Sequence, residues 1–365
     1  MKIECGKDKL KEVIALASKI TSKNTTLPVL NSILLTADNN TLKIRATNLD
    51  IGVEFTIPVK VYKTGVVAIP GNILNNTLIN LLNNEKITLE VIGNNLEISI
   101  KNNTTTIKSE QFEDFPTLPK IQSGESFIIP SKKIINGLKS VWYSASVSDI
   151  KPEISSVFIY QENNLIIFVS TDSFRLAEKR IIHKGVKEFQ GIILPFKNIN
   201  EIIRVFDNLN KDINIIFNKN QISFSFDGIY LTSRIIDGVF PDYKQIIPKE
   251  YITEVVVLKQ DIIDALKSIN VFSDKFNKVN IKIDIKNGIF ELFSKNDLGE
   301  NNIKINTTLS GDDINLCFNY KYIMDCFQSI TSDSITLQFS GDKKPMIIKE
   351  ISDNSFTYLV MPINK

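Results

Sequence analysis

The chain has 365 residues, of which 43% are hydrophobic and 23% charged, and its formal net charge is +2. Such a composition is typical of a globular protein with a full core, and the length favours two or three domains. Three cysteines without paired spacing disfavour a disulfide framework or a zinc site and indicate a reducing, cytoplasmic location. The N-terminal segment that begins Met1-Lys2-Ile3-Glu4 shows no apolar signal region, and no apolar run approaches 18 residues, so we expect neither secretion nor a membrane span.

Six times along the chain, a short apolar strand leads through a turn into an amphipathic helix. The first helix shows the pattern, because Leu10, Val13, Ile14 and Ala17 recur at helical spacing on one face. In chain order, the predicted helices are residues 8–20, 72–82, 132–142, 198–209, 260–272 and 320–330. Self-similarity at a regular spacing indicates a fold built by repeating one unit.

The six units pair into three repeats, because each pair of helices is associated with a strand hairpin. The predicted hairpins join residues 31–35 to 42–46, 156–160 to 165–170, and 279–285 to 289–293. Linkers with proline, serine and glycine follow the first two repeats. We therefore predict an α+β fold of three repeated domains, each an antiparallel β-sheet layer covered on one side by two helices, over residues 1–122, 123–248 and 249–365.

Residues that usually carry catalysis are scarce. The single histidine, His183, follows a predicted strand, and no G-x-S-x-G, H-E-x-x-H or G-x-x-x-x-G-K-S/T pattern occurs. Acidic pairs such as Asp312-Asp313 and Glu113-Asp114 fall in turn or linker contexts, where solvated carboxylates are common. The sequence therefore predicts a non-catalytic protein with no catalytic residue, metal ion or cofactor.

Positive charge is concentrated on the predicted helices. Residues 7–23 hold five lysines against two acidic residues, and residues 131–143 hold three lysines and no acid. Since the whole chain is nearly neutral, the strands and loops must be acidic overall. Such a separation of basic helices from acidic strands and loops creates an electrostatic field that attracts a polyanion to one surface, without base-specific readout. The alternative is that these lysines are merely solvated.

Several motifs, taken in order, resemble one known family. They are Leu27-Pro28-Val29-Leu30-Asn31 through Leu35, Ala46-Thr47-Asn48-Leu49-Asp50, Ser170-Thr171-Asp172-Ser173-Phe174-Arg175, Phe240-Pro241-Asp242-Tyr243 and Tyr358-Leu359-Val360-Met361-Pro362. Together they resemble the bacterial DNA polymerase III beta subunit, the replicative sliding clamp, over essentially the whole chain. The resemblance implies a head-to-tail homodimer that closes into a ring, with helices lining a central pore and β-sheets outside.

The resemblance also implies partners. A clamp of this family encircles double-stranded DNA without sequence preference and is retained topologically. It tethers the DNA polymerase III catalytic subunit, the clamp loader and other replication and repair proteins, which confers processivity. These partners dock short peptides with apolar and aromatic anchors into a cleft between the second and third domains.

Site residues follow from the resemblance position by position. The expected peptide-binding cleft comprises Ile154, Thr171, Ser173, Phe174, Arg175, Leu176, Pro241, Ile246, Asn319, Tyr322, Val360, Met361 and Pro362. The expected DNA-facing residues are Lys9, Lys11, Lys19, Lys23, Asn24, Lys132, Lys133, Lys139, Lys197, Arg204 and Lys267. The expected dimer interface comprises Thr104, Thr106, Ile107, Val271, Phe272 and Phe276.

The chain also departs from the family pattern. Phe174 stands where histidine is common, Ser173 where glycine is common, and Gln245 where arginine is common, which leaves peptide preference open. Lys23 and Asn24 replace a basic pore position, and the helix predicted from residue 72 lacks basic side chains, so weaker DNA contact is expected there. Two other interpretations remain: a monomeric repeat scaffold that binds peptides, and an enzyme with an unrecognised site.

Overall fold

The computed structural model describes residues 1–21, 27–81, 86–101, 103–184, 188–189 and 191–363. The chain divides into two compact units. Unit 1 comprises Met1–Lys132 and Lys197–Asp237, and unit 2 comprises Lys133–Phe196 and Gly238–Lys365. Within the described residues, no helix is both long and apolar enough to cross a membrane.

All six predicted helices are present, and each begins at the residue after its strand ends. They are α1 (Lys7–Ile20), α2 (Gly71–Asn80), α3 (Ser131–Val141), α4 (Phe196–Phe206), α5 (Lys259–Ile269) and α6 (Tyr320–Cys326). Four of them, α3 to α6, end earlier than predicted. After α3, α5 and α6 the chain tightens into a 3₁₀ turn, a common way to satisfy terminal carbonyl groups. These turns are η2 (Trp142–Ser144), η4 (Asn270–Phe272) and η5 (Phe327–Ser329). The predicted end of the second helix lies outside the described residues.

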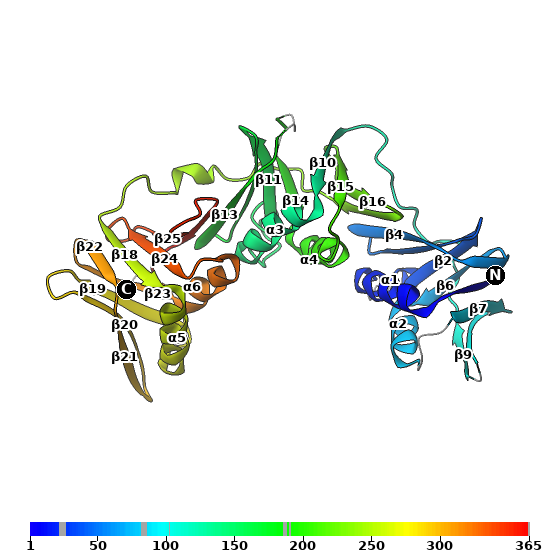
Figure 1. Cartoon of the computed structure of the whole chain (residues 1–365), viewed down its shortest axis with the longest axis horizontal. Coiled ribbons are helices and arrows are strands. Elements are labelled where there is room, and N and C mark those ends of the chain that lie inside the picture. Colours follow the sequence, from blue (N-terminus) through cyan, green and yellow to red (C-terminus); the bar gives the residue numbers. More distant parts are fainter. Residues whose placement is uncertain (22–26, 82–85, 102, 185–187, 190, 364–365) are drawn as a thin grey trace. The chain divides into compact units, whose positions relative to one another are not determined.

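Unit 1 contains two antiparallel sheets. One has the strand order β5-β1-β7-β8-β9, and the other the order β10-β15-β16-β17-β4-β3-β2-β6. Helices α1 and α2 contact each other, and α1 packs on β3 and β4 (Figure 1). The strands are β1 (Lys2–Gly6), β2 (Ser32–Asp38), β3 (Thr41–Thr47), β4 (Ile51–Pro58), β5 (Lys60–Lys63), β6 (Gly65–Pro70), β7 (Lys86–Ile92), β8 (Asn95–Ile100), β9 (Asn103–Lys108), β10 (Glu125–Pro130), β15 (Asp212–Phe217), β16 (Gln221–Phe226) and β17 (Ile229–Arg234).

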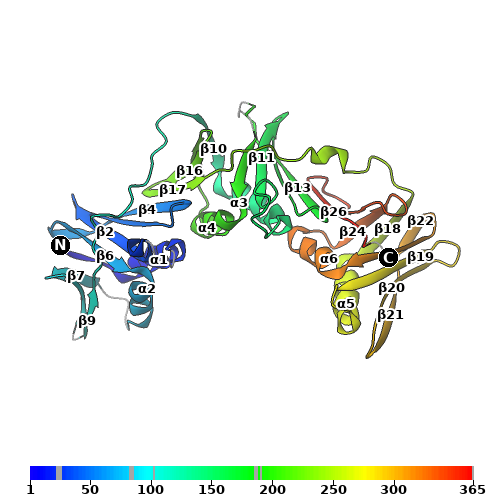
Figure 2. The ribbon, with the colours of Figure 1, turned by 180° about the vertical axis from the view of Figure 1, so that it is seen from behind.

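Unit 2 repeats this plan with the sheet orders β14-β11-β12-β13-β26-β25-β24-β18-β22 and β21-β20-β19-β23. Helix α5 packs on β20 and β21, and α6 contacts β26 (Figures 1 and 2). The strands are β11 (Ser156–Glu162), β12 (Leu165–Thr171), β13 (Arg175–Ile182), β14 (Ile192–Pro195), β18 (Thr253–Leu258), β19 (Lys278–Asp284), β20 (Ile289–Asn296), β21 (Gly299–Ile305), β22 (Thr308–Gly311), β23 (Ile314–Asn319), β24 (Ser334–Phe339), β25 (Met346–Glu350) and β26 (Phe356–Val360).

Two strand pairs join segments that are far apart in the sequence. In unit 1, β4 pairs antiparallel with β17, and in unit 2, β13 pairs antiparallel with β26. Each pairing makes one sheet out of strands from two predicted repeats. The prediction of repeated antiparallel sheets with covering helices is confirmed, and the three predicted hairpins are β2–β3, β11–β12 and β19–β20.

Candidate functional site

A tight loop between β12 and β13 forms one wall of the candidate site. Thr171 Oγ1 donates to the carbonyl of Arg175 at 2.6 Å and accepts the Ser173 N–H at 3.1 Å. Asp172 Oδ1 accepts the N–H groups of Phe174 and Arg175 at 2.9 and 3.0 Å. Ser173 has a φ of 77°, a left-handed conformation that costs a residue with a side chain more than it costs glycine. The loop is thus fixed by its own polar groups and holds Phe174 outward.

Arg175 connects this loop to helix α6. Its Nε lies 2.9 Å from Asp172 Oδ2 and its Nη1 lies 2.5 Å from Asp325 Oδ2. The guanidinium also lies over the Tyr322 ring, 4.5 Å from the centroid. Burial lowers the pKa of Arg175, but Tyr358 and the two carboxylates outweigh this and raise it above the ordinary value. A buried charge held by two carboxylates and a ring face makes this connection rigid.

The segment after β26 forms the second wall. Strands β13 and β26 lie side by side (Figure 2), and their register sets Arg175 opposite Val360, so the next residue leaves the sheet beside the loop. The Met361 N–H donates to the Phe174 carbonyl at 2.8 Å, and the Ile363 N–H donates to the Cys317 carbonyl at 2.7 Å. The chain from Met361 to Ile363 is therefore held between the loop and strand β23.

Between these walls lies a pocket of about 460 Å³, which we call the α6 pocket. Two large apolar side chains face solvent there, since Phe174 is 60% and Phe276 55% exposed. Exposed aromatic side chains around a concave surface are typical of a binding site. The pocket is lined by Phe174, Phe276, Lys278, Asn319, Tyr322, Met361, Pro362 and Ile363.

The structure brings together part of the cleft expected from the sequence. Five expected residues line the pocket: Phe174, Asn319, Tyr322, Met361 and Pro362. Four others are buried beneath or beside it and can only support it: Thr171, Arg175, Leu176 and Val360. Ser173 is exposed in the loop and is not among the lining residues, nor are Ile154, Pro241 and Ile246.

Three lining residues were not expected in the cleft, namely Phe276, Lys278 and Ile363. Phe276 was assigned to the dimer interface instead, but it lines this pocket. Lys278 reaches the pocket because β19 pairs with β23 in a register that sets Lys278 opposite Asn319. The strand pattern alone does not reveal this register, since the two residues are far apart in the sequence.

Unit 1 contains a second loop with the same hydrogen bonds, between β3 and β4. Thr47 Oγ1 donates to the Ile51 carbonyl and accepts the Leu49 N–H, and Leu49 has a φ of 78°. Asn48 Oδ1 accepts the N–H groups of Asp50 and Ile51, as Asp172 does in unit 2. The two loops are therefore equivalent positions of the repeat.

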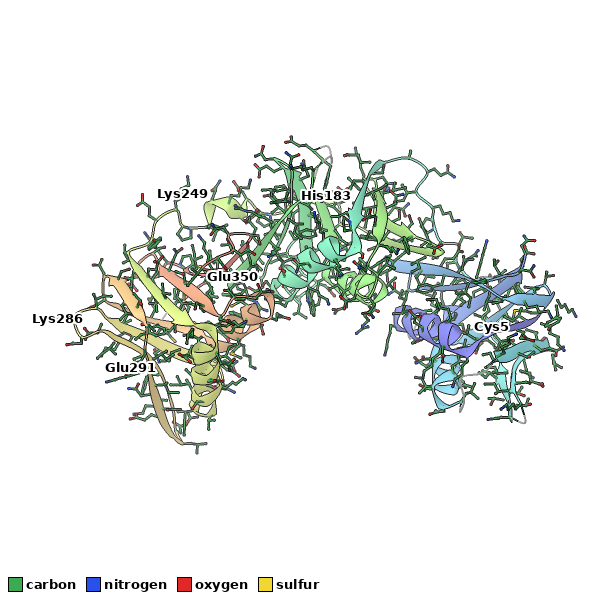
Figure 3. The ribbon with its side chains drawn as sticks, viewed as in Figure 1. Cys5, His183, Lys249, Lys286, Glu291 and Glu350 are labelled. Atoms are coloured by element: carbon green, nitrogen blue, oxygen red, sulfur yellow. The ribbon has the colours of Figure 1, made fainter. Side chains whose placement is uncertain are left out.

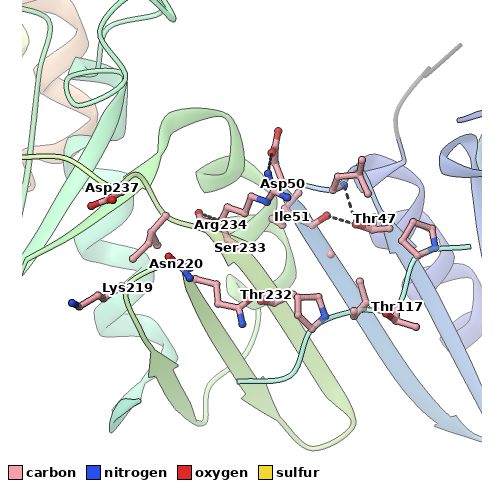
Figure 4. A pocket seen from close by; sticks show the side chains of 17 residues that line it. Thr47, Asp50, Ile51, Thr117, Lys219, Asn220, Thr232, Ser233, Arg234 and Asp237 are labelled. Atoms are coloured by element: carbon pink, nitrogen blue, oxygen red, sulfur yellow. Dashed lines mark hydrogen bonds and ion pairs between the residues drawn. The ribbon is translucent and has the colours of Figure 1, made fainter. Parts of the chain in front are cut away.

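The hollow beside this second loop is lined by both polar and apolar residues and is partly covered by the chain itself (Figure 4). Its volume is about 440 Å³, and Asp50, Arg234 and the segment around Thr117 line it. A Cβ on Gly52 would lie 2.3 Å from Leu118 Cδ2, so the leucine covers the glycine. The Tyr230 hydroxyl donates to the Pro119 carbonyl at 2.8 Å and fixes this segment. We call it the self-filled hollow.

The described basic residues expected to face DNA lie on helices or directly beside them. Lys11 and Lys133 are half-buried, and the remaining ones are exposed. Local partners neutralise part of this charge, because Lys9 pairs with Glu12 at 3.0 Å and Arg204 with Glu201 at 2.6 Å. Lys23 and Asn24 lie outside the described residues.

The expected dimer-interface residues fall into different environments. Strand β9 is at the end of its sheet, and its residues Thr104 and Thr106 are exposed. Val271 is 70% exposed, whereas Phe272 is half-buried and approaches Gly299. Ile107 is only 4% exposed, so its side chain packs inside its own unit and not on the surface.

The remaining candidates for chemistry are dispersed. His183 follows the end of β13, and its N–H donates to the Asn164 carbonyl (Figure 3). The three cysteines are buried and unbridged, and burial raises the pKa of the Cys5 thiol to about 12. The described part of the chain has no group of three or more His, Cys, Asp or Glu side chains placed to hold a metal ion. Fold and pocket together define a protein of the clamp type, built from repeated strand–helix units.

Comparison with known proteins identifies the family. Models of the DNA polymerase III beta subunit match residues 1–119 (N-terminal domain), 128–242 (central domain) and 244–364 (C-terminal domain). The chain belongs to this family. It is a DNA sliding clamp and not an enzyme.

Individual relatives cover the chain throughout. The beta sliding clamp of Synechococcus elongatus is 26% identical over 372 residues, covering 100% of this chain and 99% of the relative. That of Staphylococcus epidermidis is 26% identical and covers 94% of both. The DNA polymerase III beta subunit of Thermotoga maritima matches with a TM-score of 0.94 at 26% identity, covering 100% of this chain and 99% of that one. A Pseudomonas aeruginosa sliding clamp solved with griselimycin shares the fold, with a TM-score of 0.94 at 20% identity and full coverage of both chains.

Proposed function

We propose that two copies of this chain close head to tail into a ring that encircles double-stranded DNA. Strand β9 of one copy would add to an open sheet edge of the other, and β21 is such an edge in unit 2. The hydrogen bond from the Ser109 N–H to the Asn94 carbonyl fixes the β8–β9 register, in which Thr104 and Thr106 direct their N–H groups away from β8. These free donors are the groups that strand addition requires.

Within the ring, the basic helices would face the DNA backbone. Exposed lysines such as Lys132 and Lys139 on α3, and Lys267 on α5, come from two of the six helices. Contacts of this kind are independent of base sequence and weaken with salt. Retention is then topological, so the ring slides along the duplex while remaining on it. We also place the protein in the cytoplasm, because its three cysteines, buried and without a disulfide, fit a reducing compartment.

The α6 pocket is the proposed docking site for partner peptides, those of the DNA polymerase III catalytic subunit, the clamp loader and other replication and repair proteins. The observation that carries this proposal is the pair of exposed aromatic side chains, Phe174 and Phe276, around a pocket with a rigid wall at Arg175. Rigid concave sites with aromatic anchors bind short apolar peptides well, because little order must be imposed on the site. The Pseudomonas aeruginosa clamp solved with griselimycin supports ligand binding by a protein of this fold.

Two measurements test the ring. Small-angle scattering at several concentrations should give a mass near twice 41.3 kDa and a hollow pair-distance profile. Protein assembled by a clamp loader on nicked circular DNA should stay bound through a gel-filtration column and be released when the circle is cut. A compact single-subunit mass at all concentrations would instead favour a monomeric peptide-binding scaffold.

A further inference from the structure

One lining residue of the α6 pocket differs from all others in chemistry. Among the described residues that line it, only Lys278 carries a charge, and the rest are apolar, aromatic or amide side chains. Lys278 begins β19, and its main chain pairs with that of Asn319, so both stand on the same wall. The Asn319 Oδ1 accepts the Lys321 N–H at 3.0 Å, which leaves its amino group as a donor for a ligand.

The charges around Lys278 leave it available to a ligand. Its Nζ lies 3.8 Å from Asp274 Oδ2, a long separation for an ion pair, and the two side chains are 39% and 31% exposed. Its Nζ also lies 5.2 Å from the centroid of the Phe276 ring, and Lys275 Nζ lies 5.1 Å from the same centroid. The ammonium groups of Lys275 and Lys278 therefore both lie near the Phe276 ring, and Asp274 supplies the one carboxylate paired with Lys278 among the described residues.

The other nearby carboxylates are engaged elsewhere. Asp172 and Asp325 both bind Arg175, at 2.9 and 2.5 Å. No acidic side chain is among the described residues lining the pocket. A carboxylate that entered beside Phe276 would thus meet a partly exposed ammonium group with only a weak competitor.

We propose that the α6 pocket selects peptides that carry an acidic side chain next to an aromatic or leucine anchor, and that Lys278 is the selecting residue. This inference rests on the docking function proposed above. The anchor enters between Phe174 and Phe276, and the cation–ring contact of Lys278 places its ammonium group beside that anchor. The carboxylate pairs with Lys278, and the charge complementarity distinguishes partners that are otherwise equally apolar.

The test uses two labelled synthetic hexapeptides. Both carry one leucine and one phenylalanine as anchors, with aspartate next to the phenylalanine in one and asparagine in the other. Dissociation constants are measured by fluorescence anisotropy on the full-length wild type, Lys278→Gln and Lys278→Glu. The matched control is Lys282→Gln, which removes an exposed lysine from the same strand, outside the pocket. Circular dichroism checks that each variant is folded.

We expect the wild type and the control to bind the aspartate peptide about threefold to fivefold more tightly than its twin at low salt, the range of a partly exposed ion pair. Lys278→Gln should abolish the preference and Lys278→Glu should reverse it, and 0.5 M salt should reduce it. Equal binding of both peptides by the wild type, or a preference that survives Lys278→Gln, overturns the inference while leaving docking intact. If neither peptide binds the folded wild type, peptide docking itself is contradicted.

Discussion

Replacing Phe174 by alanine should weaken peptide docking without unfolding the protein. The residue is 60% exposed, so of the roughly 200 Å² that a phenylalanine can bury, about 120 Å² remains accessible in the free chain. If docking covers half to all of this area at about 25 cal/mol per Å², the lost free energy is about 1.5–3 kcal/mol. The dissociation constant should therefore increase by about tenfold to 150-fold.

Folding should be nearly unaffected, because the loop is held by groups that this substitution leaves in place. Asp172 accepts the Phe174 N–H, and the Met361 N–H donates to its carbonyl. Urea unfolding should thus shift by less than about 0.5 kcal/mol, as is usual for exposed sites. The control is Ile182→Ala, a 65% exposed side chain in the same unit that does not line the pocket. A folded Phe174→Ala variant that binds a labelled leucine–phenylalanine peptide within twofold of wild type would refute the reasoning.

Three further outcomes are expected. Thr106→Pro removes an outward N–H of β9 and should lower the mass in solution toward that of one subunit. Thr106→Ser keeps this N–H and should leave the mass unchanged, whereas a stable dimer of the proline variant would exclude β9 as the interface. Gly52→Ala should lower the free energy of unfolding more in the wild type than in a Leu118→Ala variant, because the added methyl group then has no leucine to meet. In a double-mutant cycle measured by urea unfolding, the two effects should differ by at least about 0.5 kcal/mol, and equal effects would contradict the contact between residues 52 and 118. Burial and Glu178 raise the pKa of Tyr243, so the folded chain keeps the phenol proton to higher pH than the unfolded chain, and the stabilisation that this proton provides is complete below about pH 10 and lost as pH rises. Between about pH 10 and 11.5 the free energy of unfolding of the wild type should therefore fall faster than that of Tyr243→Phe, by up to about 1.4 kcal/mol per pH unit. Parallel plots of unfolding free energy against pH for the two proteins would contradict this.

The repeating architecture was predictable because each unit has a local signature. An apolar strand, an immediate turn and a helical apolar face such as that of Leu10, Val13 and Ile14 depend on neighbours in the sequence. The helix ends were less predictable, since whether the chain continues as a 3₁₀ turn, as at Trp142–Ser144, depends on tertiary packing.

The site was predictable only in part, because it is assembled from distant segments. The resemblance supplied Phe174 and Met361, whereas Phe276 and Lys278 reach the pocket through strand pairing that no local pattern specifies. Burial was a second limit. Leu176 and Val360 are apolar residues of the kind that line peptide-binding pockets, but the paired strands β13 and β26 bury their side chains almost completely.

The self-filled hollow affects how many partners the protein can hold. Because Leu118 lies over Gly52, the chain itself covers part of the equivalent position in unit 1, and no aromatic side chain is among the described residues that line the hollow there. Of the two equivalent loops in the described part of each subunit, only the one in unit 2 adjoins a pocket with exposed aromatic side chains. A ring of two such subunits would bind two partner peptides at once through its α6 pockets, so the polymerase and the other partners would have to share these two sites or exchange on them.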